Sequence, residues 1–481
     1  MDAPWPSSAF MAVKSRLDVR ELTAAKWRRA SDTPKIEWAT VECASKKAHG
    51  CGKHGQKIVE GLTLYVRRPD LASSPSTGCP DLTSAVAISL SAEGARSVEA
   101  EVGSPGGELQ VRGSLMTVHR QLLVLLVGFR GLDNGNLTYY LVYDSTDASL
   151  HMIPYLPAYL NARYTLAPVP VNSADGLKLV LMAREIGSRL AGDGDVVCLC
   201  TPATRANPAS GTWQMKPQRF PKLPRPFKVE ETFSLGGMAF WADLSQGLVY
   251  CNLLEECSVV DFQFIKLPHG YEINYYSETT EYMQAEPLER RTTRTIGCVG
   301  SSIKFVCIDS RRAHRGHEIV MNVWTLDLQQ RFWKRDGGFP CPWNEFSKCI
   351  GFMSATELRD VELLYPTLMP DGALCFLLRW RDWVRAREEP CYICSFDMRL
   401  KSSLWFGLVR HHSATGPFIL PCNFFTEVRR PTPQTSEEAA KRLDTDAGVQ
   451  TCGCSVPRRQ QATSDYYPRY SSLGDKSYCW A

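Results

Sequence analysis

Short apolar runs separated by polar turns follow one another along the chain from Ile58 onward. The runs are rich in Val, Leu, Ile, Phe and Tyr, the residue types that favour β-strands. Turn-forming pairs such as Asp193-Gly194 and Gly236-Gly237 separate them. This pattern predicts a β-rich domain over residues 58–428.

One unit recurs along these runs: an apolar strand ends in an acidic residue, a polar turn follows, and a second strand begins with a bulky apolar residue. The four copies cover 139–154, 238–268, 323–335 and 391–407. We expect the carboxylates that close the first strands, those of Asp144, Asp243, Asp327 and Asp397, to accept backbone N–H bonds across the turn. We expect the aromatic residues that follow, such as Trp333 and Trp405, to pack between sheets.

Repeated hairpins of this kind are typical of the radially stacked sheets of a β-propeller. The runs group into about six sheets, which the sequence places around 62–90, 122–154, 177–220, 227–268, 295–335 and 373–410. The fold class predicted is therefore all-β, an irregular propeller of about six blades. The copies are unevenly spaced, at roughly 50 to 75 residues, which leaves a pair of twisted sheets in a β-sandwich as the alternative.

Two segments differ from the β-rich region. Residues 1–57 carry eleven Lys or Arg against six Asp or Glu, and Met11–Arg29 contains strong helix formers. We interpret 1–57 as a basic, partly helical extension in which Pro34 limits the helix. Residues 429–481 begin with a polar stretch that has almost no large apolar side chain, and we interpret them as a disordered tail.

Residues 241–256 followed by Phe264–Gly270 resemble the grass-type plant family called domain of unknown function 1618. The shared residues are Trp241, Asp243, the pair Gly247-Leu248, and the pair Leu267-Pro268. The hairpin at 140–154 is also similar, whereas Asn252 departs from the Asp that members often carry. The resemblance is best over 238–380 and implies a propeller-like protein related to the kelch-like regions that accompany F-boxes. It implies no catalytic residues, since the family motif looks structural.

Bulk composition narrows the class of protein. The 481 residues are 44% apolar, enough for a large core, and a net charge of +4 does not indicate a nucleic-acid or membrane partner. Many of the 18 cysteines lie in apolar strand-like runs, where a free thiol behaves as a small hydrophobe. No apolar signal segment is visible, and the run Leu122–Phe129 is too short to span a bilayer. We expect reduced cysteines and a cytoplasmic or nuclear location.

The strongest metal candidate is the group Cys43, His49, Cys51 and His54, because Zn²⁺ takes four nitrogen or sulfur ligands. The spacing from Cys43 to His49 is unusual for zinc and no Cys-x-x-Cys frames the group. A basic solvated loop is therefore the favoured interpretation, and no metal or cofactor site is predicted.

Three further clusters also favour structural roles. Cys391 and Cys394 have the spacing of a redox pair but lie in an alternating strand rather than at a helix start. His314 and His317, like His411 and His412, have no partner carboxylate or nucleophile in sequence. The stretch 379–388 interleaves arginines with two tryptophans, a composition that holds single-stranded nucleic acid, but one short patch is typical of a solvated loop.

The sequence contains no nucleophile elbow, phosphate-binding loop or dinucleotide fingerprint. We therefore expect a non-enzymatic scaffold that binds protein partners through propeller loops. The alternative is a substrate receptor of a ubiquitin ligase, because Leu17, Leu22 and Trp27 resemble part of an F-box that would bind the ligase adaptor. An enzyme that uses a propeller's central channel is the third hypothesis.

Overall fold

A computed structural model describes residues 10–13, 18–19, 38–67, 69, 79–102, 109–131, 136–173, 176–187, 194–201, 213–254, 257–273, 288–309, 320–342, 361–380, 391–400, 402–409 and 417–425. Residues 1–428 form one compact unit. The predicted disordered tail lies outside the described residues.

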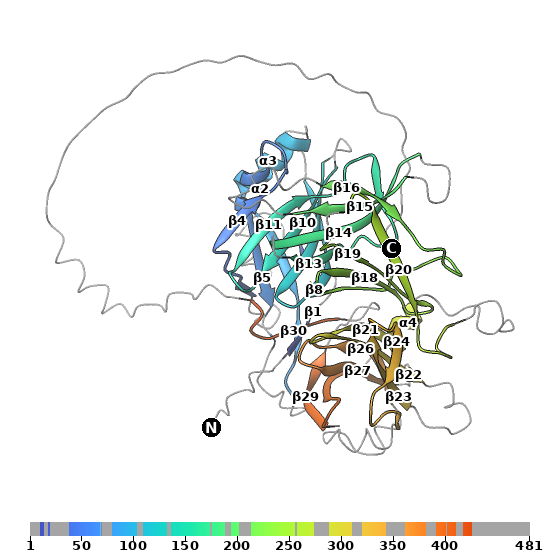
Figure 1. The fold of residues 1–481 in the computed structure, drawn as a ribbon. Helices are drawn as coiled ribbons and strands as arrows, with labels where there is room; N and C mark the ends of the chain where they lie inside the picture. The colour runs from blue at the N-terminus through green and yellow to red at the C-terminus, as the bar shows by residue number, and fades with distance from the viewer. Residues whose placement is uncertain are drawn as a thin grey trace, which may run out of the picture. The chain divides into compact units, whose positions relative to one another are not determined.

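Sheet 1 joins the beginning and the end of this unit (Figure 1). Sheet 1 is the name used here for two separately hydrogen-bonded sheets, β30-β1-β6 and β2-β7-β5-β3, which the chain links directly between β6 and β7. Their strands are β30 (Phe418–Pro421), β1 (Phe10–Val13), β6 (Thr83–Ser84), β2 (Asp18–Val19), β7 (Val86–Leu90), β5 (Leu62–Arg67) and β3 (Trp38–Thr40). Strand β1 is antiparallel to β30, with Met11 opposite Leu420, and parallel to β6, with Ala12 opposite Thr83. The N-terminal strand therefore lies inside a sheet.

Sheets 2 and 3 follow in chain order. Sheet 2 has the order β4 (Ser45–Ala48), β11 (Ser149–Pro154), β10 (Asn136–Asp144), β9 (Leu122–Arg130) and β8 (Gln110–His119). Sheet 3 contains β12 (Leu160–Ala162), β13 (Val169–Ser173), β14 (Gly176–Glu185), β15 (Asp195–Cys200) and β16 (Gln214–Arg219).

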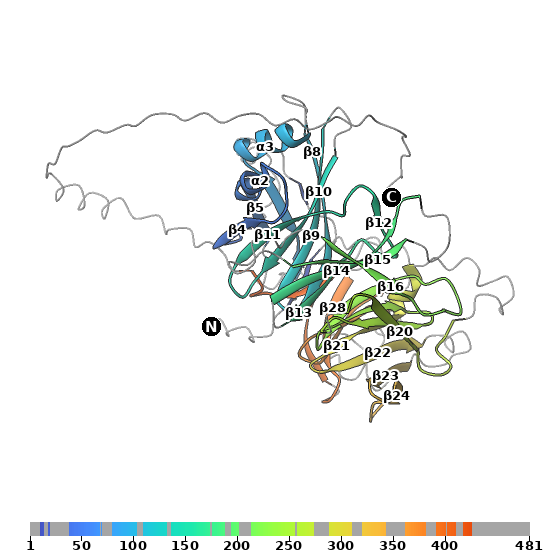
Figure 2. The ribbon, with the colours of Figure 1, turned by 45° about the horizontal axis from the view of Figure 1, so that its top comes forward.

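The remaining strands form three antiparallel sheets (Figure 2). Sheet 4 contains β17 (Glu231–Leu235), β18 (Met238–Asp243), β19 (Gly247–Asn252) and β20 (Val260–Lys266). A short parallel pair between β16 and β20 joins sheets 3 and 4. Sheet 5 contains β21 (Arg294–Val299), β22 (Ser302–Asp309), β23 (Val320–Asp327), β24 (Phe332–Arg335) and β25 (Cys341–Pro342). Sheet 6 contains β26 (Val361–Leu368), β27 (Ala373–Trp380), β28 (Cys391–Asp397) and β29 (Ser402–Val409).

Each sheet shares an apolar core with the sheet before it and the sheet after it. Alternate residues of one strand serve the two cores: in β9, Leu123 and Leu125 face sheet 1, whereas Leu122 and Val124 face sheet 3. Such two-sided burial explains why the central strands are almost continuously apolar. Further cores lie between sheets 3 and 4, 4 and 5, and 5 and 6.

Sheet 1 completes the cyclic order, because it also shares a core with sheet 6. Ala12 and Ile419 of sheet 1 pack with Cys375, Trp405 and Val409 of sheet 6. Strands of successive sheets from sheet 3 to sheet 6 are also in contact, β13 with β17, β17 with β21, and β21 with β26. Small sheets in this arrangement make the fold mostly β and propeller-like, as predicted, and differ from the single shared core of the β-sandwich alternative.

The predicted helix over Met11–Arg29 is wrong where the chain is described. Phe10–Val13 and Asp18–Val19 are strands, and Met11, Ala12 and Val13 are at most 2% exposed. Helix propensity is a weak preference, and two strand partners with an apolar core on each side outweigh it here. The boundary predicted at residue 57 also fails, because helix α2 (Gly55–Gly61) runs through it.

Helix α3 (Ala92–Val102) was not predicted either, although its start has a recognisable signal. The side-chain oxygen of Ser91 accepts the backbone N–H of Gly94 at 3.1 Å, as an N-cap does. Helix α3 packs against α2 beside sheets 1 and 2 (Figure 2). The third helix, α4 (Leu288–Thr293), leads directly into β21. No helix in the described part of the chain is long and apolar enough to cross a membrane.

Candidate functional site

The four acidic residues of the repeated unit do accept backbone N–H groups, as predicted. Asp144 accepts from Thr146 at 2.8 Å, Asp327 from Gln330 at 3.0 Å, and Asp397 from Arg399 at 2.7 Å. In these three copies the carboxylate ends the third strand of a sheet. Asp243 instead ends the second strand, β18, so its turn lies at the other end of the strands of its sheet. The copy at 238–268 is therefore not equivalent to the other three.

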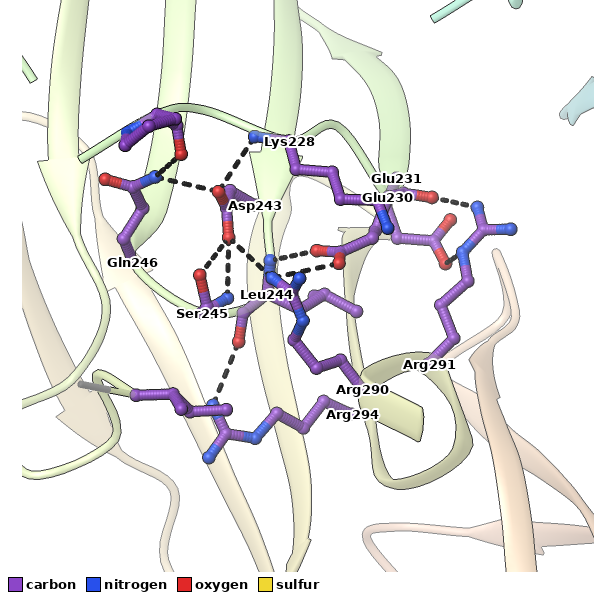
Figure 3. A network of polar contacts seen from close by, with 12 residues as sticks. Lys228, Glu230, Glu231, Asp243, Leu244, Ser245, Gln246, Arg290, Arg291 and Arg294 are labelled. Atoms are coloured by element: carbon purple, nitrogen blue, oxygen red, sulfur yellow. Dashed lines mark hydrogen bonds and ion pairs between the residues drawn. The ribbon is translucent and has the colours of Figure 1, made fainter. Parts of the chain in front are cut away.

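Asp243 is the centre of a buried polar network (Figure 3). Its side chain is 1% exposed. One carboxylate oxygen accepts the N–H of Ser245 at 2.8 Å and its hydroxyl at 2.5 Å. The other accepts the N–H of Lys228 at 2.9 Å and the amide of Gln246 at 2.8 Å. Since a carboxylate offers about four acceptor sites, Asp243 has little capacity left to act as a base.

Arg290 brings a second carboxylate into the network. Its Nη1 lies 3.3 Å from Asp243 Oδ1 and 3.1 Å from Glu230 Oε1. Glu230 also accepts the backbone N–H of Leu244 at 2.7 Å. Burial raises the pKa of Glu230 to about 7, since desolvation outweighs the attraction of Arg290. The guanidinium therefore ties α4 to the start of β17 and the end of β18.

Two more arginines of the same segment secure the neighbouring backbone. Arg294 donates to the carbonyl oxygens of Leu244 at 2.9 Å and Tyr271 at 2.8 Å. Arg291 donates to the carbonyl of Glu230 and pairs with Glu231 at 3.2 Å. The network thus consists of internal contacts that hold α4 and β21 against sheet 4.

The family-motif residues around this network are structural, as predicted. Trp241 is fully buried in the core between sheets 3 and 4, with its ring 5.6 Å from that of Phe262. Gly247 has a φ of +153°, and a Cβ atom there would lie 2.2 Å from the carbonyl oxygen of Ile265. Only glycine fits this close approach of two strands.

Both predicted packing aromatics also lie between sheets. Trp333 belongs to the core between sheets 4 and 5 and donates its indole N–H to Lys266 O at 2.7 Å. Trp405 belongs to the core between sheets 6 and 1.

The zinc candidates are not brought together. Cys51 donates its thiol to the carbonyl of Met152 at 3.2 Å, and the backbone of His54 donates to Glu101 at 2.7 Å. Cys43 lies near the carbonyl of Val41, 3.9 Å away. Within the described residues, no group of three or more His, Cys, Asp or Glu side chains is arranged to hold a metal ion.

His49 instead forms a chain that sequence reasoning missed, because its members are 102 residues apart. His49 Nε2 lies 2.9 Å from His151 Nδ1, and His151 Nε2 lies 3.1 Å from Ser149 Oγ. A serine next to an oriented imidazole is the arrangement of a nucleophile and its base. Ser149 and His49 are only 3% and 4% exposed, however, and the chain joins β4 to β11 inside sheet 2.

The remaining sequence candidates have structural surroundings or lie outside the described residues. Cys391 and Cys394 are buried in β28, and burial raises their pKa values to about 11 and about 12. Arg379 pairs with Glu362 at 2.7 Å, and Trp380 is buried. The residues outside the described part are His314, His317, His411, His412 and the arginine-rich stretch 381–388.

We expect the cysteines to differ sharply in reactivity. Cys257 is exposed, whereas Cys375 and Cys394 are fully buried and have raised pKa values, which disfavours the reactive thiolate. In a timed alkylation of the native protein read by peptide mass spectrometry, Cys257 should be modified first. Cys375 and Cys394 should react only after unfolding. Early modification of either would contradict their burial.

A pH prediction rests on His119, which lies at the end of β8 with Nε2 3.0 Å from Ser234 Oγ. Burial, and then the nearby Arg120, lowers the pKa of His119 to about 4. Because the unfolded chain binds this proton at a pKa near 6.5, the free energy of unfolding should fall by about 2 kcal/mol from this group between pH 7.5 and 5.0. His119→Gln should show a correspondingly smaller loss in urea unfolding at the two pH values. An unchanged loss would contradict the prediction.

Comparison with known structures finds weak likenesses at low sequence identity. The β-propeller domain of the Trilobed protease from Pyrococcus furiosus is 7% identical, with 60% of this chain and 69% of that chain covered and a TM-score of 0.30. The WD40 domain of SCAP from fission yeast is 9% identical, with 67% and 76% covered and a TM-score of 0.24. A GH43_1 enzyme from Xanthomonas citri is 10% identical, with 64% and 94% covered and a TM-score of 0.25.

No curated protein matches the chain. A family model does match, over the segment that contains Trp241, the Asp243 turn, α4, sheet 5 and the start of sheet 6. Residues 241–375 match the model of the family described as "Protein of unknown function (DUF1618)".

Proposed function

We propose that the chain is a non-enzymatic protein-interaction scaffold, built as a six-bladed propeller with sheets 1 to 6 as its blades. The observation that carries the proposal is that the polar groups that could act in catalysis are buried, whereas large apolar side chains are exposed. The candidate catalytic groups, Asp243, Glu230 and Ser149, are buried and engaged with other groups of the protein. Seven large apolar side chains of the described residues are more than 40% exposed: Tyr159, Ile186, Met215, Leu254, Phe332, Leu400 and Leu404.

Exposed aromatic and aliphatic side chains are the groups that supply anchors in protein interfaces. Six of the seven lie in a connection between two strands or in the first two residues of the strand that follows it. Leu404 is the exception and lies within β29. Loops and turns on a rigid β framework suit recognition, because they vary without disturbing the cores.

The test is cross-linking of the tagged full-length chain in cells that express it, followed by mass spectrometry. We expect a partner recovered at near-equal amounts with the chain. In parallel, a fluorophosphonate probe should leave Ser149 unlabelled, because the hydroxyl is buried. A labelled Ser149 that is lost in His151→Asn would favour an enzyme and contradict the scaffold.

The alternative proposal is that the chain is a substrate receptor of a ubiquitin ligase, a scaffold with one specific partner. It would relate the chain to kelch-like and F-box proteins. Of the F-box-like segment, only Asp18–Val19 is described, and it is a strand rather than part of a helix. Binding of the purified full-length chain to the ligase adaptor, measured by calorimetry, tests it. We propose a cytoplasmic or nuclear location for either version.

A further inference from the structure

We propose that the tips of two hairpins, β23–β24 and β28–β29, form a docking surface for an acidic segment of a partner protein that also carries apolar side chains. The inference rests on the proposed scaffold function and names the site and the chemistry of its partner. The surface consists of Phe332 and Leu400 with the basic residues Arg331, Lys334, Arg335 and Arg399.

The two apolar side chains are the most exposed large ones in the described part of the chain. Leu400 is 73% exposed and Phe332 is 62% exposed. Leu400 lies in the turn between the third and fourth strands of sheet 6, and Phe332 is the first residue after the corresponding turn of sheet 5. Two apolar side chains presented in this way are candidate anchors for a partner.

The two tips belong to neighbouring sheets. Met398, which precedes Arg399 and Leu400, is part of the core shared by sheets 5 and 6. That core also contains Met321 and Val323 of β23, the strand that leads into the other tip. The turn of β28–β29 is therefore anchored to the core that sheets 5 and 6 share, and both tips follow the third strands of these two neighbouring sheets.

The charge at the tips is basic overall, because four exposed basic side chains outnumber the two carboxylates of the turns, those of Asp327 and Asp397. Asp327 accepts the N–H of Gln330 at 3.0 Å. Asp397 accepts the N–H groups of Arg399 at 2.7 Å and Leu400 at 2.9 Å. The basic side chains Arg331, Lys334, Arg335 and Arg399 are all exposed. Arg331 also donates to Gln263, and Arg335 lies over the ring of Trp324 with its guanidinium carbon 5.5 Å from the ring centre.

A third hairpin shows that the turn itself does not require these side chains. The hairpin β10–β11 has the same carboxylate-to-amide bond, from Thr146 N–H to Asp144 at 2.8 Å. Its tip carries the small, buried Ala148 and the acidic Asp147 in place of an exposed apolar residue and a base. The exposed apolar and basic side chains at the tips of sheets 5 and 6 are therefore not required to form this turn. Complementarity then selects a partner with carboxylates and apolar side chains.

The test is selection of 16-residue peptides from a random phage-displayed library on the full-length chain. Enriched peptides should combine Asp or Glu with Leu, Phe or Trp. Synthesised peptides should bind the double variant Phe332→Ser/Leu400→Ser about 30-fold more weakly, the size typical of lost anchors. The charge variant Arg331→Glu/Arg399→Glu should weaken binding as well, and Ile186→Ser, at an exposed apolar site elsewhere, should leave it unchanged.

Failure of this surface is distinguishable from failure of the scaffold. Peptides without carboxylates, no enrichment, or equal binding by the double variants would overturn the docking surface. If a cellular partner is still cross-linked to both double variants, the scaffold function stands and this surface is wrong. Binding of the chain to phosphatidylserine vesicles that is lost in the double variants, without any peptide binding, would assign a membrane to the surface and overturn the protein partner.

Discussion

Deleting residues 1–19 should lower the free energy of unfolding by about 5 kcal/mol, a large part of the 5–15 kcal/mol typical of a domain. The deletion removes β1 from between β30 and β6. Met11 and Val13 leave the core between sheets 1 and 2, and Ala12 leaves the core between sheets 6 and 1. Burying one large aliphatic side chain contributes about 1.5–3 kcal/mol, so these losses add up. Urea unfolding followed by tryptophan fluorescence measures the change.

Deletion of residues 1–9 provides the matched control, because it leaves β1 whole. That variant should unfold at the urea concentration of the full chain. If the 1–19 deletion also unfolds at the urea concentration of the full chain, with the same dependence of the free energy on urea, β1 does not contribute to stability. The original interpretation of 1–57 as an appendage would then regain support.

Replacing Arg290 by Met should cost about 3–5 kcal/mol, the range for breaking one side of a buried ion pair. The guanidinium is 13% exposed, and the substitution leaves Glu230 and Asp243, at 4% and 1% exposure, without their shared cation. The loss should shrink toward pH 5, because Glu230 takes up a proton there and no longer needs a counter-charge. Urea unfolding at pH 8 and pH 5 measures both effects.

Arg219→Met is the control for this experiment. Arg219 pairs with Asp261 at 2.7 Å, but both side chains are largely exposed, so its loss should cost less than about 1 kcal/mol. In the double variant Arg290→Met/Glu230→Gln, part of the stability should return, since one uncompensated carboxylate is gone. Equal costs for Arg290→Met and Arg219→Met would show that the network is not held by charge.

Local sequence patterns were sufficient to predict most of the strands and the turns in which a carboxylate accepts backbone N–H groups. The runs predicted at 122–154, 227–268 and 295–335 became strands because their side chains are mostly β-branched, aromatic or Leu, and most of the inner strands are buried on both faces. The bonds from Asp144, Asp327 and Asp397 join residues two or three apart, so the chemistry of the turn is local. Three strands that the sequence did not predict have less regular patterns: β8 contains Arg and Gly, β13 contains Pro and Asn, and β26 contains Pro beside a bulge.

The sequence by itself therefore determined a mostly β chain, its turn chemistry and the structural character of Trp241. Only the tertiary structure decided what depends on contacts distant in sequence. Phe10–Val13 is a strand because residues 418–421 and 83–84 pair with it, which outweighs its helix-forming neighbours. Asp243 is buried, unlike the other three carboxylates, because Arg290, 47 residues away, and the 228–230 segment close over its turn. Such partners leave no periodic signal along the chain, since their spacing depends on the fold that brings them together.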